Sequence, residues 1–296
     1  MLKKQLKQLL VIIILITTFT AFGIYVHGHP EIIRQLGRLS LVKVGLLLFM
    51  YGLFLGSLIW IQRTTLLLCH INLKSTENVL LVIYSTVLNF FGPLQSGPAF
   101  RGIYLKQKYD LDLRLYTVAT LIYYGLFAAV SAIWISAYLF GAWVVLLILW
   151  LLAGTFIIRR YDTKLIEKLP TWGQALQLKF ITNLAVATIL QLSLIATIYY
   201  IELNSLGLHA KTVAAIVYSG VANFALFVSL TPGAIGFREA FLVFSQQLHH
   251  FSNQQIVTAG LIDRGVYVIF LGILFVVSVL LHAKQKLSTV VVRPNI

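Results

Sequence analysis

The sequence has few charged residues and a single cysteine. Charged side chains make up 11% of the 296 residues, whereas a soluble domain carries about 25%. Apolar side chains make up 59%. This composition excludes an ordinary soluble globule, a disordered chain and a collagen-like fibre. The single cysteine, Cys69, excludes an internal disulfide.

The apolar residues gather in runs that are long enough to cross a bilayer. A helix needs about 20 such residues to span a hydrocarbon core of about 30 Å. We therefore predict an all-α polytopic membrane protein with six transmembrane helices. The first run is longer than the apolar part of a signal peptide and lacks a good cleavage site. The expected spans are 9–26, 41–61 (ended by Gln62 and Arg63), 115–140, 142–158, 180–201 and 257–281.

Two further apolar stretches are interrupted by proline and glycine, which weaken a helix. Irregular backbone at membrane depth must be buried in protein or line a wet cavity. We therefore predict two re-entrant helical hairpins. The first has arms at 79–91 and 99–105, and the second has arms at 213–230 and 237–248. The residues expected to shape the two backbone breaks are Gly92, Pro93, Gly97, Pro98, Pro232, Gly233 and Gly236.

The formal net charge is +14, from 23 lysines and arginines against 9 acidic residues. In a soluble protein this excess would indicate nucleic acid, but in a membrane protein it is typical of cytoplasmic loops. With six spans and an inner N-terminus, sixteen basic residues fall on cytoplasmic segments and four on outer ones. We predict a bacterial plasma (inner) membrane protein with both termini in the cytoplasm and no nucleic-acid partner. The four outer residues are Arg34, Arg38, Lys43 and Lys211.

Short sequence words recur after the two breaks. Residues 100–105 resemble 237–242, and residues 121–125 resemble 261–265. Each pair falls at the same place in a unit of two spans, a hairpin and a third span. Inverted repeats with equivalent broken helices are typical of transporters whose site lies near the midplane. We predict a single transmembrane domain, 1–296, made of repeat units of roughly 1–140 and 141–296.

The candidate binding residues lie at the breaks and in the last span. Arg101 and Arg238 are each expected to open the helix that resumes after a break. A helix N-terminus favours an anion, and a guanidinium adds a bidentate phosphate partner. A charge at membrane depth costs about 2.5–3.5 kcal/mol and usually marks function. We predict a site for a lipid phosphate. The alternative is that each arginine pairs with a carboxylate or caps backbone carbonyls.

Glu239 is expected to meet Arg264 or Arg101, because adjacent residues on a helix do not face each other. The three arginines against Glu239 and Asp263 leave one net positive charge, which suits one phosphodiester anion. The two carboxylates either relay protons or only form a buried ion-pair network.

Asn89 and Asn223 lie nine residues before Pro98 and Pro232 and are expected to satisfy carbonyls or a headgroup. The sequence shows no metal-ligand spacing, no cofactor motif and no catalytic constellation. We therefore expect no metal, no cofactor and no enzymatic activity.

The second break resembles a known family. Residues 230–240 are similar to the signature of the flippase-like family, which is the transmembrane region of lysylphosphatidylglycerol synthases and its stand-alone relatives. Residues 89–101 are similar to that family's first signature, although Phe100 stands where the family usually has an acidic residue. The resemblance implies a flippase or scramblase of an anionic phospholipid or lipid-linked intermediate, with phosphate-headgroup lipids as ligands. It also implies a stand-alone member without the synthase domain.

Two other functions remain open at this point. One is a lipid- or glycan-modifying enzyme, for which Glu239 and Asp263 are the candidate acid–base residues. The other is a non-transporting membrane partner of a lipid- or glycan-biosynthesis enzyme. A second copy of the chain is a further partner that the sequence allows.

Overall fold

A computed structural model describes residues 39–91, 96–141, 143–158, 177–207, 209–228 and 237–291, together with His27, Gly37 and Ala234. These residues form helices and connecting segments without any strand, so the all-α prediction is confirmed. The predicted first span, 9–26, lies outside the described residues. So do five of the predicted break residues, which are Gly92, Pro93, Pro232, Gly233 and Gly236.

Four helical segments are long and apolar enough to cross a membrane. They correspond to four of the six predicted spans. A fifth apolar helix, α8 (Trp143–Ile158), corresponds to another. The four segments are α3 (Leu41–Leu68), α6 (Leu113–Ile135) with its continuation α7 (Ala137–Phe140), α10 (Leu178–Ser205) and α14 (Asn253–Val291).

The predicted end of α3 at Gln62 and Arg63 is wrong, because the helix continues to Leu68. Of the two polar residues that suggested an end, Arg63 is exposed but Gln62 faces the protein. Gln62 is 3% exposed, and the buried Thr65 donates its hydroxyl hydrogen to the carbonyl of Ile61. Tertiary packing therefore carries this helix past its polar sequence.

The first break joins α4 (Ser75–Phe91) to α5 (Ser96–Tyr109) in an antiparallel helical hairpin. The Gly97 N–H donates to Asn89 Oδ1 at 2.7 Å, which ties the start of α5 to α4. A Cβ at Gly97 would lie 2.5 Å from the backbone oxygen of Ser85. Only glycine allows the two backbones to approach this closely.

The predicted restart of the helix at residue 99 is wrong, since α5 already begins at Ser96. Pro98 lies in the first turn, where a missing backbone donor is tolerated. Arg101 consequently lies in the second turn of α5 and does not open the helix as predicted. Fewer free N–H groups than we expected remain at this helix N-terminus to bind an anion, because Asn89 already accepts from one of them.

The second break joins α11 (Thr212–Val228) to α12 (Phe237–Phe244), which is followed by α13 (Gln246–His249). The rings of Phe224 and Phe241 lie 6.4 Å apart, and those of Tyr218 and His249 lie 5.4 Å apart. These contacts make the chain turn back along α11. Arg238 is the second residue of α12, as predicted.

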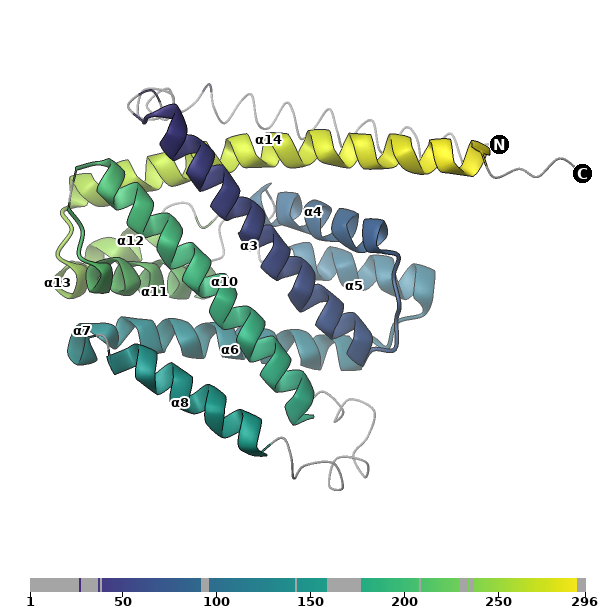
Figure 1. Cartoon of the computed structure of the whole chain (residues 1–296), viewed down its shortest axis with the longest axis horizontal. Helices are drawn as coiled ribbons and strands as arrows, with labels where there is room; N and C mark the ends of the chain where they lie inside the picture. Colours follow the sequence, from purple (N-terminus) through teal and green to yellow (C-terminus); the bar gives the residue numbers. More distant parts are fainter. Residues whose placement is uncertain are drawn as a thin grey trace, which may run out of the picture.

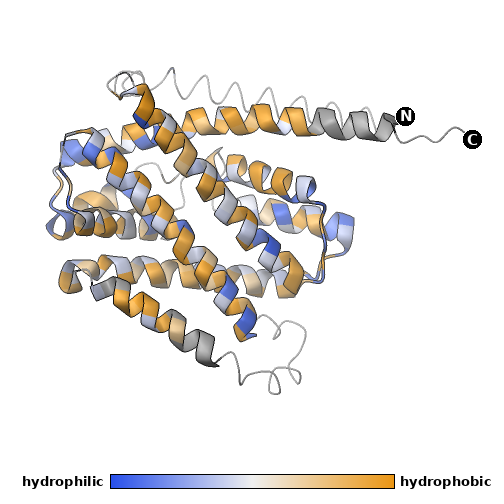
Figure 2. Ribbon diagram, in the orientation of Figure 1, coloured by the Kyte–Doolittle hydropathy of each residue, from blue (hydrophilic) through white to orange (hydrophobic). Residues whose placement is uncertain are grey.

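The two hairpins extend from opposite ends of the bundle (Figure 1). The helices α3 and α10 pack along each other through the middle, with α4–α5 towards one end and α11–α13 towards the other. The order of long helix, hairpin and long helix occurs twice along the chain, although the predicted duplication itself stays a prediction. Apolar residues predominate along the long helices (Figure 2), and many large apolar side chains are exposed, including Phe49, Leu139 and Trp150. Such a surface suits lipid contact.

Candidate functional site

All four long helical segments and both hairpins contribute to one cavity of ≈ 260 Å³. The folded chain therefore brings together residues that are far apart in the sequence. Ala234, which has a positive φ of 54° and lies between α11 and α12, also lines this cavity. Six predicted site residues line it, namely Asn89, Arg101, Asn223, Arg238, Asp263 and Arg264.

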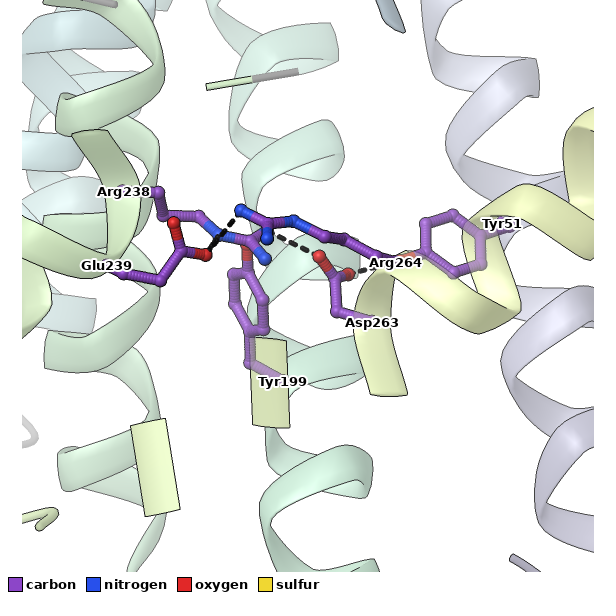
Figure 3. Close-up of polar contacts among 6 residues, drawn as sticks. All are labelled: Tyr51, Tyr199, Arg238, Glu239, Asp263 and Arg264. Carbon is purple, nitrogen blue, oxygen red and sulfur yellow. Dashed lines mark hydrogen bonds and ion pairs between the residues drawn. The ribbon is translucent and has the colours of Figure 1, made fainter. Parts of the chain in front are cut away.

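Arg238 is the centre of a buried polar network (Figure 3). Its side chain pairs with Asp263 from α14 and donates to the Tyr199 hydroxyl of α10 at 3.2 Å. Tyr51 of α3 donates to the other oxygen of Asp263 at 2.5 Å. The network thus joins four helices that are distant in the sequence. Arg238 nevertheless keeps Nε and Nη2 without a hydrogen-bond acceptor among the described residues.

Glu239 lies beside this network and pairs with Arg264, as expected. Arg264 Nη2 lies 2.6 Å from Glu239 Oε1. Arg238 Nε also lies 3.5 Å from the same oxygen, so its sequence neighbour is within reach, contrary to our expectation. Gly260 leaves room for the pair, since a Cβ there would lie 3.3 Å from Glu239 Oε1.

Arg101 meets neutral partners. Its Nη1 donates to Gln62 Oε1 at 2.5 Å, and its buried Nε has no acceptor among the described residues. It lines the cavity together with Tyr123 and Tyr124 of α6. Within the described part of the chain, Arg101 forms no ion pair with a carboxylate.

The two predicted asparagines have different surroundings. Asn89 accepts from the Gly97 N–H and so closes the first hairpin. Asn223 is fully buried and donates to Ser219 Oγ at 3.1 Å. Its Oδ1 has no hydrogen-bond partner among the described residues, although the residue lines the cavity. Gly97 and Pro98 pack at the helix contact and do not line the cavity.

The sequence analysis missed several polar residues at the site. Gln62 was taken as a helix end, and the tyrosines of the network gave no signal because tyrosine is common in apolar spans. Glu202 gave a signal, since it is the single carboxylate in α10, but it lies one residue beyond the predicted end of that span. Its carboxyl group is fully buried, and neither oxygen has a hydrogen-bond partner among the described residues.

The charges of the cavity are unevenly distributed. Arg238 and Arg264 face Asp263 and Glu239, whereas Arg101 stands on the first hairpin without a carboxylate. The sequences of the two breaks, 92–95 and 229–236, contain no charged residue. The net positive charge of this group of five residues therefore lies on the side of Arg101.

A separate polar cluster lies at the far end of the first hairpin. Lys108, Tyr104 and Tyr109 all donate to Glu77, at 2.7, 2.7 and 2.8 Å. Burial alone would raise the pKa of Glu77, but these hydrogen bonds outweigh burial and lower its pKa below the ordinary value. The cluster ties the start of α4 to the end of α5.

Comparison with known proteins identifies the family of the chain. No curated protein and no solved structure matches it. A family model does match, over residues 7–274, which is most of the chain and includes every helix of both hairpins. Together with the long apolar helices, this match shows a multi-pass membrane protein. The chain belongs to the family described as the lysylphosphatidylglycerol synthase TM region.

Proposed function

We propose that this protein moves an anionic phospholipid, or a lipid-linked intermediate with a phosphate, between the two leaflets of a membrane. The observation that carries this proposal is Arg101, a guanidinium without a carboxylate partner among the described residues, in a cavity enclosed by both hairpins. A charged group inside an apolar bundle usually serves a substrate path. Family membership supports a role in lipid handling.

In this proposal, Arg101 holds the headgroup phosphate. Its unpartnered Nε supplies one donor, and Nη2 of Arg238 supplies a second donor from the opposite hairpin. Charge-assisted bonds of this kind are about twice as strong as neutral ones. The buried Oδ1 of Asn223 is an acceptor for a hydroxyl or amine of the headgroup. The acyl chains stay in the bilayer, and the site needs no covalent chemistry.

The hairpins would supply the route. We propose that each is re-entrant, that the two enter from opposite membrane faces, and that they meet at the cavity, since they extend from opposite ends of the bundle (Figure 1). Movements of one repeat against the other would then open the cavity to each leaflet in turn.

The charge distribution favours an orientation. Six basic residues lie where α3 ends, around the first hairpin and at the start of α6 and α10, whereas Lys43 and Lys211 lie at the other end. We propose that the first end faces the cytoplasm of a bacterial inner membrane. The six residues are Arg63, Lys74, Lys106, Lys108, Arg114 and Lys179.

The proposal is tested by reconstitution. Purified protein in liposomes should carry fluorescently labelled phosphatidylglycerol across the bilayer faster than protein-free liposomes do. Arg101→Met keeps much of the aliphatic stem but removes the charge. We expect it to slow transport at least tenfold, because losing a hydrogen bond to a charged group costs about 1.5–3 kcal/mol. Arg101→Lys should retain part of the activity.

The control variant is Asp110→Asn, which changes an exposed carboxylate outside the cavity and should transport like the wild type. If Arg101→Met also transports at the wild-type rate, Arg101 is not the phosphate ligand. If wild-type protein moves no lipid but co-purifies with a lipid- or glycan-modifying enzyme, the partner function takes its place.

A further inference from the structure

Glu202 is a buried carboxyl group that the proposed translocation does not use. It lies near the end of α10, one helical turn beyond Tyr199 of the Arg238 network. It is 0% exposed, and both carboxyl oxygens lack a hydrogen-bond partner among the described residues. The other two carboxyl groups described near the cavity, Glu239 and Asp263, each pair with an arginine, whereas Glu202 does not.

The titratable groups near Glu202 come from five helices. Electrostatic interactions connect it to Arg238 on α12 and Asp263 on α14. They also connect it to the phenols of three tyrosines, which are Tyr51 on α3, Tyr199 on α10 and Tyr218 on α11. Arg238 is the one cation in this set, and it is already paired with Asp263. An ionised Glu202 would therefore be a buried carboxylate without a direct cationic partner among the described residues.

Burying an unpaired carboxylate costs several kcal/mol, whereas a neutral carboxylic acid costs far less. Two effects therefore oppose each other at Glu202. Burial favours the protonated carboxyl, whereas the unbalanced positive charge of Arg101 in the cavity favours the carboxylate. An anion in the cavity offsets that positive charge and so favours the protonated form. With Glu202 protonated, Arg101, Arg238 and Arg264 exceed Glu239 and Asp263 by one positive charge, and a bound phosphodiester makes the site neutral. With Glu202 ionised, the same phosphodiester would leave the site negative.

We propose that Glu202 is a proton-binding site linked to anion binding in the cavity, so that a proton and a lipid phosphate occupy the protein together. This inference rests on the proposed function, because it assigns a proton partner to the same anion. The linkage is reciprocal: a proton on Glu202 favours the anion, and the bound anion favours the proton. A pH difference across the membrane could then drive lipid movement in one direction.

The test uses purified full-length protein and short-chain dihexanoyl-phosphatidylglycerol as the probe. The phosphodiester of this lipid does not titrate near neutral pH, so a pH dependence of binding reports on the protein. Above the titration midpoint of Glu202, we expect the wild-type dissociation constant to rise about tenfold per pH unit, which is the slope for one linked proton. Glu202→Gln mimics the protonated carboxyl and should bind with no such slope. Asp110→Asn should keep the wild-type slope.

Calorimetric titration in two buffers with different ionisation enthalpies counts the protons directly. At a pH above the titration midpoint of Glu202 in the free protein, the wild type should take up one proton for each lipid bound, and Glu202→Gln should take up none. Equal slopes in the wild type and Glu202→Gln, or no proton uptake by the wild type, would overturn the proposal. If Glu202→Gln does not fold, the absence of proton uptake by the wild type still overturns the proposal.

The two proposals fail in different ways. If lipid binds and Arg101→Met abolishes binding, but no proton is taken up, the inference about Glu202 alone is wrong. If the wild type binds no anionic lipid, both the proposed function and the linkage between Glu202 and the anion are wrong.

Discussion

The two hairpins place an arginine on the same cavity but give it different surroundings. In the first hairpin, Arg101 donates to the amide of Gln62 and shares the cavity with the tyrosines of α6. In the second, Arg238 meets the carboxylate of Asp263 and, more distantly, that of Glu239. The similar segments 121–125 and 261–265 differ at the two positions that matter here. Tyr123 and Tyr124 stand in the first segment where Asp263 and Arg264 stand in the second.

The comparison separates two roles that the sequence alone assigned to both arginines. A guanidinium with a carboxylate partner is a structural charge, because its charge is balanced inside the protein. A guanidinium with neutral partners keeps its charge for a ligand. Within the proposed function, we therefore assign anion binding mainly to Arg101 and a structural role mainly to Arg238. Measurements of stability can contradict this assignment.

The largest expected effect comes from removing the charge of Arg238. Arg238→Met leaves Asp263 buried with Tyr51 as its remaining hydrogen-bond partner in the described network. Breaking one side of a buried ion pair costs about 3–5 kcal/mol. Arg101→Met leaves only the Gln62 amide oxygen without its hydrogen bond, which should lower the free energy of unfolding by about 1–2 kcal/mol. Equilibrium unfolding of both variants in detergent measures the difference.

The double variant Arg238→Met with Asp263→Leu serves as the control for that difference. Replacing both members of a buried pair by apolar residues is often neutral or stabilising. The double variant should therefore recover most of the stability that Arg238→Met loses. If Arg101→Met is as destabilising as Arg238→Met, the distinction between the two hairpins does not hold.

The next effect concerns how the first hairpin closes. Gly97→Ala would place a Cβ 2.5 Å from the Ser85 oxygen, and backbone cannot rotate away as a side chain can. We expect a loss of about 1–3 kcal/mol from overpacking. Gly52→Ala in α3 is the matched control, because nothing lies within 4 Å of its added Cβ. It should be neutral or slightly stabilising, and a destabilisation equal to that of Gly97→Ala would contradict the close approach.

The two asparagines give a smaller contrast. Asn89→Ala leaves the Gly97 N–H without its acceptor at the hairpin turn, which costs about 1–2 kcal/mol. Asn223→Ala removes one described hydrogen bond, to Ser219, and should cost about 1 kcal/mol or less. Thermal unfolding of the two variants ranks them. The reverse order would mean that Asn223, and not Asn89, fixes the shape of its hairpin.

Much of the fold could be predicted from the sequence because its signals are local. Apolar run length located α3, α6, α10 and α14, and proline with glycine located both breaks. The errors occurred where packing outweighs local preference. Gln62 looked like a helix end but faces the interior, and Pro98 looked like part of a break but fits the first turn of α5.

The site was predictable in its charged members and not in its neutral ones. A charge within an apolar run stands out in any sequence, which identified Arg101, Arg238, Asp263 and Arg264. Tyrosine and glutamine do not stand out, and their roles depend on which helices meet. The sequence therefore located the arginines but could not show that one meets carboxylates and the other amides and phenols.

The smallest expected effect is a pH dependence at the outer ends of the two hairpins. At the second hairpin, burial lowers the pKa of His249, which donates to the Leu242 carbonyl as a neutral ring. At the first, hydrogen bonds from Lys108 and two tyrosines lower the pKa of Glu77. Both groups bind protons more readily in the unfolded chain. Both therefore contribute stability at high pH that is lost on acidification.

The two losses should occur in separate pH windows. The His249 contribution begins to fall below about pH 6.5, the ordinary value for histidine, and the Glu77 contribution below about pH 4.3. Unfolding measured across this range should show that His249→Gln removes the first loss and Glu77→Gln the second. A stability that rises as the pH falls from neutral through the first window would contradict the buried neutral ring of His249 and leave the first hairpin as the pH-sensitive one.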